Sequence, residues 1–355
     1  MVFPFPKIVS LLQCSARPFL SMQALLDAIA TFSLPVEAQR IFHGRGGLHP
    51  GCEHWTLDAF PPVLVLTRFL PATEDTEQEL EVIGAALQAR WQQLAPGAPL
   101  NWVFQCRSSA LRQQGRSENR LMAGSVPEPH TVLEQGALFR VQVEHGQNHG
   151  LFLDMAEGRR WVHHHTAAHR DQRFGFTVLN LFAYTCAFSV VALRAGAKHV
   201  VNVDMSRSAM ATGQHNHRLN GLDGGASFLV HDIFSTWGKI NRSGPYSLVV
   251  IDPPTYQKGS FVATKDYARL VRRLPELMAP GGHALLCLNA PELGVAFLQD
   301  QVRELAPALE FVERVANGAA FADVSPERAL KVLVYRMPPL PGLDSTPGKA
   351  ENAAH

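Results

Sequence analysis

The pattern of apolar and polar positions changes along the chain. Between residues 177 and 337, short apolar runs alternate with amphipathic segments, a pattern that predicts β-strands separated by α-helices. Right-handed crossovers join strands that alternate with helices, so this part predicts an α/β fold with a doubly wound, mainly parallel sheet. The predicted strands are 177–181, 200–204, 227–232, 247–252 and 283–289.

The end of this region predicts a change of strand direction. A helix is expected over residues 265–278 and stops at Pro280-Gly281-Gly282, because proline and glycine do not continue a helix. Two later apolar runs, 311–315 and 330–337, predict a terminal antiparallel hairpin.

The preceding segment predicts a smaller α+β domain. Runs at 63–69 and 101–107 are typical of strands, and they flank a predicted helix over 74–94. That helix has apolar residues at helical spacing, namely Leu80, Ile83, Leu87 and Trp91. A further strand is expected over 137–143. Four segments are therefore expected: 1–22 as an unstructured or over-long start, 23–130 as the small domain, 131–337 as the larger domain, and 338–355 as a disordered tail.

Composition excludes several classes of protein. The 355 residues are 46% hydrophobic and 18% charged with a net charge of +1, so the whole molecule does not bind polyanions by bulk charge. No apolar run reaches the roughly 18 residues of a membrane span, and the apolar start lacks a signal-peptide cleavage site. The five cysteines are scattered without metal-ligand spacing, which predicts reduced thiols in a cytoplasmic protein.

Residues 248–256 carry the most specific signal for chemistry and read Leu-Val-Val-Ile-Asp-Pro-Pro-Thr-Tyr. An apolar strand ends on Asp252, and two prolines then prevent its continuation. In an open α/β sheet, ligands bind outside the carboxyl ends of the strands. A carboxylate, free carbonyls and the Tyr256 ring at this position are suited to hold a planar nitrogen heterocycle beside a cofactor. The alternative interpretation is a turn that only closes a strand.

Two earlier strands also end on aspartate. Asp204, followed by Ser206 as the expected helix cap, is placed to accept hydrogen bonds from ribose hydroxyls, and Asp232 is placed to accept from an adenine amino group. Residues 178–188, around the end of the first strand, contain no glycine. This argues against NAD or FAD, whose pyrophosphate requires a close approach of the backbone. The pattern predicts a nucleoside cofactor without phosphates, such as S-adenosylmethionine.

Four segments, 178–185, 203–207, 218–222 and 251–256, resemble a family of bacterial methyltransferases that act on the 23S ribosomal RNA of the large subunit. The group contains cytosine-C5 and guanine-N7 enzymes, and the resemblance is strong over about residues 130–337. It implies a class I methyltransferase fold with a seven-stranded sheet and S-adenosyl-L-methionine as the cofactor. It also implies ribosomal RNA, or a ribosome assembly intermediate, as the partner.

The resemblance also implies roles for individual residues. Asp204 would hold the ribose, Met205 the adenine face, Asp232 the adenine amino group, and residues 182–185 the methionine part. Phe152 and Asp154, in a segment similar to one that folds over the cofactor, would close the site. The complete set expected to bind the cofactor is Phe152, Asp154, Asn180, Phe182, Ala183, Tyr184, Thr185, Asp204, Met205, Ser206, Asp232, Ile233, Asp252 and Pro253.

One position departs from the family pattern. Many members have glycine after the Tyr-Thr pair, where this chain has Cys186. A thiol there is expected to narrow the cofactor pocket slightly.

The base atom that is methylated depends on the available nucleophile. Carbon 5 of cytosine reacts only after a cysteine thiolate has added to the ring. In the resemblance, Asn289 occupies the position of that cysteine, Thr255 follows Asp-Pro-Pro, and Cys287 is expected to be buried in the sheet. A lone-pair nitrogen such as guanine N7 needs no such activation. The sequence therefore favours the guanine-N7 branch, with Asp252, Tyr256 and Asn289 as the catalytic residues and the Tyr256 ring stacked on the base.

Arginines in two segments, 101–120 and 158–173, predict a local RNA-binding surface, because arginine forms bidentate contacts with phosphate. The alternative is that both segments are solvated helix faces. The candidates are Arg107, Arg112, Arg116, Arg120, Arg159 and Arg160. The histidines at 163–165 and 169 have no acidic or cysteine partner at ligand spacing, so no metal site is expected.

Two other functions stay open. One is methylation of a protein or small molecule on nitrogen, which would keep the cofactor and change the substrate. The other is a non-catalytic RNA-binding assembly factor, for which Cys186 is the supporting feature. The sequence does not indicate an oligomeric state.

Overall fold

The structure is a computed structural model that describes residues 22–108, 111, 117–172, 174–254, 256–257 and 261–340, apart from the side chains of Glu74, Tyr256 and Gln257. The start and the tail that were expected to be unstructured lie almost entirely outside the described residues. The chain divides into two compact units. The smaller unit comprises residues 1–156 and 317–329, and the larger comprises 157–316 and 330–355.

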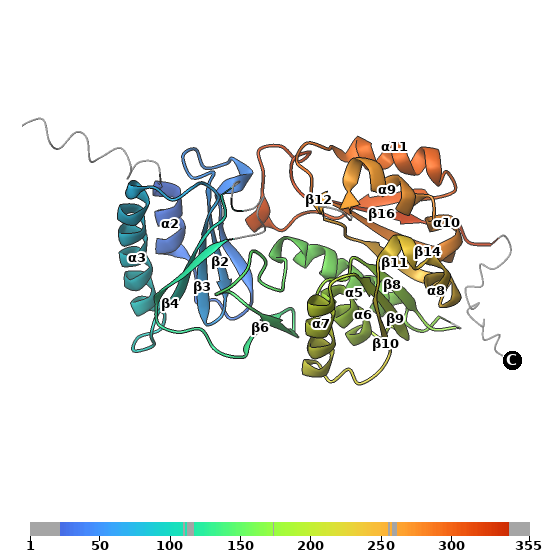
Figure 1. The fold of residues 1–355 in the computed structure, drawn as a ribbon, viewed down its shortest axis with the longest axis horizontal. Helices are drawn as coiled ribbons and strands as arrows, with labels where there is room; N and C mark the ends of the chain where they lie inside the picture. Colours follow the sequence, from blue (N-terminus) through green and yellow to red (C-terminus); the bar gives the residue numbers. More distant parts are fainter. Residues whose placement is uncertain are drawn as a thin grey trace, which may run out of the picture. The chain divides into compact units, whose positions relative to one another are not determined.

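The smaller unit is built on a five-stranded sheet among its described residues, in the order β1-β2-β3-β4-β5. Its helices α2 (Gln23–Thr31) and α3 (Glu74–Leu94) cover one face of that sheet (Figure 1). The bounds of α3 are those predicted, and the apolar face of α3 packs on the sheet. The strands are β1 (Gln39–His43), β2 (Trp55–Phe60), β3 (Val63–Arg68), β4 (Asn101–Cys106) and β5 (Glu118–Ala123).

A second hairpin belongs to this unit, although the boundary was expected at residue 130. Strands β6 (His130–Glu134) and β7 (Ala137–Val141) pair with each other. The Ala38 N–H donates to the carbonyl of Leu133 at 2.8 Å, and the His130 ring lies 2.9 Å from the Phe60 carbonyl. These contacts explain why the compact unit extends to residue 156.

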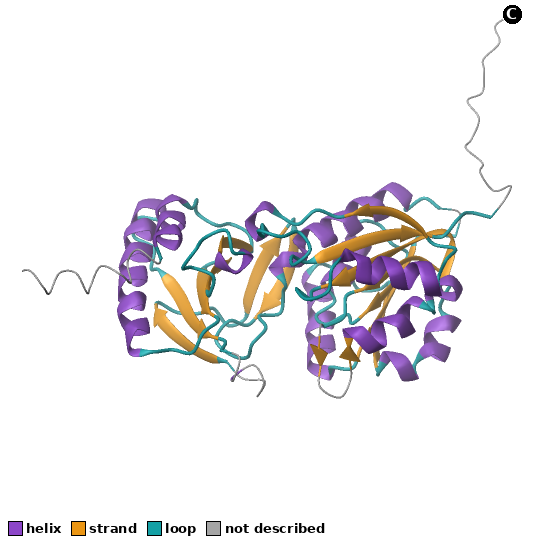
Figure 2. Ribbon diagram, turned by 90° about the horizontal axis from the view of Figure 1, so that it is seen from above, coloured by secondary structure: helices purple, strands orange, loops and turns teal. Residues whose placement is uncertain are grey.

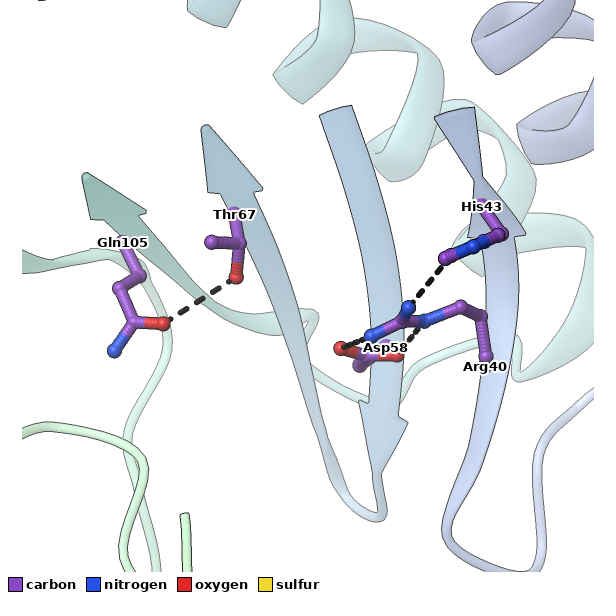
Figure 3. A network of polar contacts seen from close by, with 5 residues as sticks. All are labelled: Arg40, His43, Asp58, Thr67 and Gln105. Carbon is purple, nitrogen blue, oxygen red and sulfur yellow. Dashed lines mark hydrogen bonds and ion pairs between the residues drawn. The ribbon is translucent and has the colours of Figure 1, made fainter. Parts of the chain in front are cut away.

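The sheet face opposite the helices is polar and mostly buried. Arg40 donates two hydrogen bonds to the Asp58 carboxylate, at 2.7 and 2.9 Å, and a third to His43 Nδ1 at 2.7 Å (Figure 3). Burial, reinforced by the Arg40 charge, lowers the pKa of His43 to about 4, so its ring stays neutral and accepts from Arg40. The next two strands continue this layer, since Thr67 donates to the Gln105 amide oxygen at 3.4 Å (Figure 3).

The larger unit contains a seven-stranded sheet among its described residues, in the order β10-β9-β8-β11-β14-β16-β15. The first five strands in this order are parallel, and β16 runs antiparallel to both β14 and β15. The predicted doubly wound sheet with a terminal antiparallel hairpin is confirmed. The strands are β8 (Thr177–Leu181), β9 (His199–Asp204), β10 (Ala226–Val230), β11 (Tyr246–Ile251), β14 (Met278–Leu288), β15 (Glu310–Arg314) and β16 (Lys331–Arg336).

Helices cover both faces of this sheet (Figure 2). One face carries α5 (Ala156–His169), α6 (Ala187–Arg194) and α7 (Arg207–Leu219). The other carries α8 (Trp237–Arg242), α9 (Ala263–Val271), α10 (Leu274–Leu277) and α11 (Val295–Leu305). Leucine, isoleucine and valine side chains of the parallel strands form the main core with this second group of helices.

Some element bounds differ from those predicted. The helix expected over 265–278 is two helices, because Pro275 lacks an amide hydrogen and is tolerated only in the first turn of a helix, where it lies in α10. Strand β14 begins at Met278, so Pro280 and the two glycines lie inside the strand and not at the end of a helix. Strand β10 ends at Val230, which leaves Asp232 just beyond it, at the start of a short 3-10 helix over Ile233–Ser235.

Candidate active site at the carboxyl edge of the sheet

A cavity lies at the carboxyl ends of the parallel strands in the larger unit. It is lined by residues that follow β8, β9 and β10, namely Phe182, Asp204, Met205, His231, Asp232, Ile233 and Phe234. Five of these were predicted to bind the cofactor. His231 and Phe234 were not predicted. Each is adjacent in sequence to a predicted residue, so their position shortly after β10 could have indicated them.

The loop after β8 has an unusual backbone. Phe182, Tyr184 and Cys186 have φ angles of 57°, 48° and 61°, in the left-handed region that is costly for residues with a side chain. Such a conformation persists only where the surroundings fix it. Every second residue from Phe182 to Cys186 is left-handed, and this pattern gives the loop between β8 and α6 one defined backbone shape.

Asp204 supplies much of that fixation. Its Oδ2 accepts from the Tyr184 N–H at 2.9 Å and its Oδ1 from the Ser206 N–H at 2.7 Å. Ser206 caps α7 as predicted, since its hydroxyl accepts from the Ala209 N–H at 3.3 Å. Each carboxylate oxygen has a further lone pair. Asp204 can therefore hold the loop and still accept hydrogen bonds from a ligand.

The residues around the cavity fit a nucleoside. Phe182 and Ile233 provide apolar walls, and Met205 is 51% exposed at the strand end, where its thioether can lie against a planar ring. Asp232 is exposed and accepts from the Phe234 N–H at 3.1 Å, so its carboxylate is oriented at the rim. Two carboxylates beside apolar walls suit hydroxyl and amino donors on a purine nucleoside, and the predicted S-adenosylmethionine has those groups.

Asn180 does not contact the cavity, contrary to the prediction. Its side chain is buried and donates to the Asn202 amide oxygen at 2.9 Å, and Asn202 donates to the Ser189 hydroxyl at 3.0 Å. Ser189 in turn lies 2.9 Å from His217 Nε2. Burial lowers the pKa of His217, so the ring is neutral and can accept from Ser189. This network links β8, β9, α6 and α7 beneath the loop, which is a supporting role.

The other predicted loop residues contribute mainly backbone groups. Ala183 and Thr185 are buried, and the Thr185 carbonyl accepts from the Asn216 amide at 3.0 Å. The Ala183 N–H donates to the Val203 carbonyl at 3.1 Å. These bonds tie the loop to β9 and α7.

Cys186 points away from the cavity, so the expectation that its thiol narrows the pocket is wrong. Its sulfur is buried against α7, 3.8 Å from Met210 Sδ, in a small apolar cluster. A Cβ placed on Gly213 would lie 2.5 Å from this sulfur. The φ of Cys186 lies in the left-handed region, which glycine adopts without the steric cost that a side chain brings.

On the other side of the edge, Asp252 and Pro253 directly follow β11 and Asn289 directly follows β14. Asn289 is exposed, whereas Cys287 is 0% exposed, as predicted for a core thiol. The backbone of Tyr256 pairs with Val262 in a two-stranded hairpin, β12 (Tyr256–Gln257) with β13 (Phe261–Val262), and its side chain lies outside the described part of the structure. Thr255 also lies outside it.

Sequence reasoning missed Tyr267 on α9. Its ring is fully buried and its hydroxyl donates to the Cys287 carbonyl at 3.0 Å. Burial raises the pKa of this hydroxyl, with smaller contributions from Cys287 and Asp252, so it remains a donor. A tyrosine on the apolar face of a helix is typical of the hydrophobic core. Nothing in the sequence distinguishes Tyr267 from such a core residue.

Other predicted residues belong to the smaller unit, are buried, or lie outside the described residues. Phe152 and Asp154 are in the smaller unit, where Phe152 is exposed and the Asp154 charge acts on Arg40. Arg112 and Arg116 lie outside the described residues. Arg159 is 3% exposed, so it does not fit an RNA-binding role that requires an accessible guanidinium.

The histidines of α5 form an aromatic cluster with β14. The rings of His165 and His169 lie 4.2 Å apart, and His165 lies 4.3 Å from His283 on β14. Trp161 stacks on His165 at 4.5 Å. In the part of the chain that the structure describes, no group of three or more ligand residues has the geometry to hold a metal ion.

A family model for S-adenosylmethionine-dependent methyltransferases matches residues 39–336. The chain belongs to this family. The match confirms S-adenosylmethionine as the expected cofactor at the level of the family, and it covers both compact units.

Curated relatives of this methyltransferase are named for ribosomal RNA. Ribosomal RNA large subunit methyltransferase I of Aeromonas salmonicida is 30% identical over 235 residues, which cover 64% of this chain and 55% of the relative. The protein of the same name in Tolumonas auensis is 29% identical over 306 residues, covering 82% and 72%. Large subunit methyltransferase K/L of a Psychrobacter species is 36% identical over 190 residues, covering 51% and 22%. The chain spans about half or less of the length of most relatives it matches.

Solved structures agree with the fold. The crystal structure of SMU.776, a methyltransferase complexed with SAH, has a TM-score of 0.70 at 24% identity, covering 94% of this chain and 83% of that one. A tRNA m1G37 methyltransferase of M. jannaschii has a TM-score of 0.51 at 14% identity, with coverages of 80% and 72%. The class I methyltransferase fold is thereby confirmed. Separately, none of the described helices is both long and apolar enough to span a membrane.

The contact between Cys186 and Gly213 predicts a coupled pair. Gly213→Ala places a methyl group against the buried sulfur and is expected to destabilise the protein by about 1–3 kcal/mol. In a Cys186→Gly background the same substitution is expected to cost at least about 0.5 kcal/mol less. Urea unfolding of the four proteins measures this. Gly238→Ala, at a glycine with open space around it, is the control and should be close to neutral. Equal costs of Gly213→Ala in both backgrounds contradict the prediction.

The histidine cluster predicts a pH dependence of stability. Burial, together with the neighbouring histidines, lowers the pKa of His165 to about 3, and burial lowers that of His283 to about 4. The unfolded chain therefore binds protons first as the pH falls below about 6.5, and the free energy of unfolding decreases from there toward pH 4. His165→Phe is expected to reduce this loss by about 1 kcal/mol at pH 5, after allowance for partial exposure. Urea midpoints across this pH range measure the effect, and identical pH profiles for the two proteins rule it out.

Proposed function

We propose that the chain is an S-adenosylmethionine-dependent methyltransferase that modifies a ring nitrogen of large-subunit ribosomal RNA, with guanine N7 as the first candidate. The names of the relatives support ribosomal RNA as the substrate. The observation that carries the choice of nitrogen is the burial of the thiols beside an exposed Asn289 at the end of β14.

When bound, the cofactor supplies a methyl group that is already activated on a sulfonium, so the protein mainly has to align the nucleophile with it. The residues around the cavity at the ends of β8, β9 and β10 would hold the cofactor. Asp204 would accept from the ribose, Met205 and Ile233 would lie against the adenine, and Asp232 would accept from its amino group. Phe152 and Asp154 are proposed to close the site from the preceding segment.

The cysteines support attack by a base nitrogen. Methylation at cytosine C5 requires an accessible thiolate that adds to the ring. Among the described cysteines, Cys186 and Cys287 are 0% exposed, Cys52 is 1% and Cys106 is 2%. Burial also raises the pKa of the Cys186 and Cys52 thiols, which disfavours the thiolate. A ring nitrogen uses its own lone pair and needs no thiolate.

The base is proposed to lie between β11 and β14. Asp252 and Asn289 follow these neighbouring parallel strands and supply a carboxylate and an amide, which can orient the edge of a purine. Tyr256 is proposed to stack on the base. The target nucleotide must leave its helical stack to reach this position.

The RNA backbone is proposed to contact arginines in both units. In the smaller unit, Arg45 and Arg107 lie over the ring of Phe69, with guanidinium-to-centroid distances of 4.2 and 5.6 Å. A partly exposed aromatic ring close to two guanidinium groups suits both base stacking and phosphate contact. Arg120 and, in the larger unit, Arg160 are exposed enough to contribute, although each has an acidic partner, Glu77 and Glu157.

Cytosine C5 remains the second candidate. The chain is similar to two kinds of large-subunit methyltransferase, I and K/L, and this similarity does not choose a base atom. Methylation of a protein or small molecule on nitrogen, and a non-catalytic assembly role, rank behind these two candidates.

Loss of the Asp204 charge is expected to weaken cofactor binding. Asp204→Asn keeps one oxygen acceptor but removes charge-assisted hydrogen bonds, which predicts a rise in the dissociation constant for S-adenosylmethionine of about tenfold to a hundredfold. Isothermal titration calorimetry measures this, with Asp223→Asn, an exposed residue after α7, as the control that should not change affinity. Unchanged affinity in Asp204→Asn contradicts the assignment. Absence of binding by the unmodified protein favours the non-catalytic role.

Replacement of the β14 thiol separates the two base chemistries. Cys287→Ala is expected to retain methyl transfer within about threefold, because a nitrogen nucleophile needs no covalent catalyst. Activity is measured on an unmodified large-subunit RNA transcript, and the modified nucleoside is identified by mass spectrometry. A 5-methylcytidine product, or activity lost on replacement of any cysteine in a protein that still folds, contradicts nitrogen methylation. Transfer to protein but not to RNA favours a protein substrate.

A further inference from the structure

Lys331 is a fully buried lysine at the start of β16. Its exposure is 0%, and it precedes four buried apolar residues, Val332 to Tyr335, in the same strand. Burying an ammonium group is costly unless it is compensated, whereas an apolar side chain would fill the same position without that cost. A lysine at such a position therefore points to a role that packing alone does not explain.

The ammonium reaches the backbone beside a residue of the proposed site. Lys331 Nζ donates to the Ala290 carbonyl at 2.7 Å. The same carbonyl accepts from the Leu293 N–H at 3.1 Å, which closes the turn after β14. Asn289, the residue proposed to orient the base, is the one before Ala290 and follows β14 directly.

A second buried donor holds the other side of Asn289. The Tyr267 hydroxyl donates to the Cys287 carbonyl at 3.0 Å. The carbonyls of residues 287 and 290 are thus both fixed by buried side chains, while Asn289 between them is exposed. The hydrogen bonds from Lys331 and Tyr267 fix the backbone of residues 287–290. The exposed Asn289 side chain is thereby held at the carboxyl edge of the sheet.

The strand register places the tether at the edge of the sheet. Lys331 pairs with Leu288 in the antiparallel ladder of β16 and β14, and Asp252 follows the parallel neighbour β11 on the other side of β14. Because β16 is antiparallel, its first residue lies at the carboxyl end of β14, where the substrate is expected.

We propose that Lys331 is a positioning residue for methyl transfer, which acts through the Ala290 carbonyl to fix the Asn289 turn. This inference rests on the proposed function and names a residue that the chemistry of the cavity does not include. Lys331 contacts neither the cofactor nor the base in this assignment. Its loss lowers the rate of transfer to RNA and leaves cofactor affinity unchanged.

The first test is independent of activity. In Lys331→Met, an unbranched side chain fills the same space without the donor. Hydrogen–deuterium exchange of the apo protein is expected to show about tenfold faster exchange for a peptide spanning residues 289–296, because the Ala290 carbonyl loses its charge-assisted bond. Val332→Ala is the control, since it disturbs the same strand from the opposite face of the sheet and leaves that bond in place. Unchanged exchange in Lys331→Met overturns the tether.

The second test asks whether the tether serves the reaction. Lys331→Met is expected to lower kcat on an unmodified large-subunit RNA transcript by at least about tenfold, with the dissociation constant for S-adenosylmethionine within about twofold of the unmodified protein. In an Asn289→Ala background, Lys331→Met should have little further effect, because both changes act on one element. Additive losses, or a loss that matches that of Val332→Ala at an equal fall in Tm, overturn the positioning role and leave Lys331 as a structural residue.

The two proposals fail in different ways. If the unmodified protein binds the cofactor but transfers methyl groups to no RNA, the proposed function fails, and the exchange experiment still decides whether Lys331 holds the turn. If the unmodified protein methylates RNA and Lys331→Met does so equally well, only the inference about Lys331 fails.

Discussion

The Asp204 carboxylate is the interaction on which the site depends. It accepts from Tyr184 in the loop after β8 and from Ser206 at the start of α7, and so joins two strand ends through one side chain. The loop has three residues in the left-handed region, a conformation that persists only when its surroundings oppose relaxation. Two hydrogen bonds to a charged acceptor provide that opposition. The residue proposed to recognise the ribose is therefore also the residue that shapes the pocket, and its two roles share one carboxylate.

Beneath the loop, a network of hydrogen bonds between polar side chains takes the place of apolar packing between the sheet and its helices. Asn180, Asn202, Ser189 and His217 form consecutive hydrogen bonds across two strands and two helices, in a region where an unpaired polar group would be costly. A chain of directional bonds fixes the relative positions of these elements more narrowly than apolar contacts would. Burial lowers the pKa of His217, which favours the neutral ring at this position. The site therefore has a rigid base, while its exposed parts, Met205 and Asn289, remain accessible.

The sequence predicted the parts of the molecule that depend on local pattern. Alternating apolar runs predicted the strands of the larger unit and their mainly parallel arrangement, and Ser206 was predicted as a helix cap because capping depends on residues close in sequence. The direction of side chains was harder. Asn180, in β8, bonds to Asn202 in the network that reaches α6 and α7, and Cys186, in the loop after β8, packs against α7; these directions depend on strand register and on a left-handed turn. Lys331 and Tyr267 gave no signal, since their partners are backbone carbonyls distant in sequence. Pro275, in the first turn of α10, is a local feature that the predicted single helix over 265–278 did not take into account.

The proposed choice of reaction rests on which side chains are accessible at the edge of the sheet. The same class I fold accommodates many substrates, so the reaction must be inferred from the groups at the edge of the sheet. Cys287, in β14, has a buried thiol, whereas Asn289, directly after the strand, has an exposed amide. The two groups are two residues apart, and they differ in their depth in the molecule. Lys331 and Tyr267 donate to the carbonyls of Ala290 and Cys287, on either side of Asn289, and so fix the position of this turn. A shift of the turn by one residue would replace the amide that is proposed to orient the base by a different side chain, and the hydrogen bonds from Lys331 and Tyr267 oppose that shift.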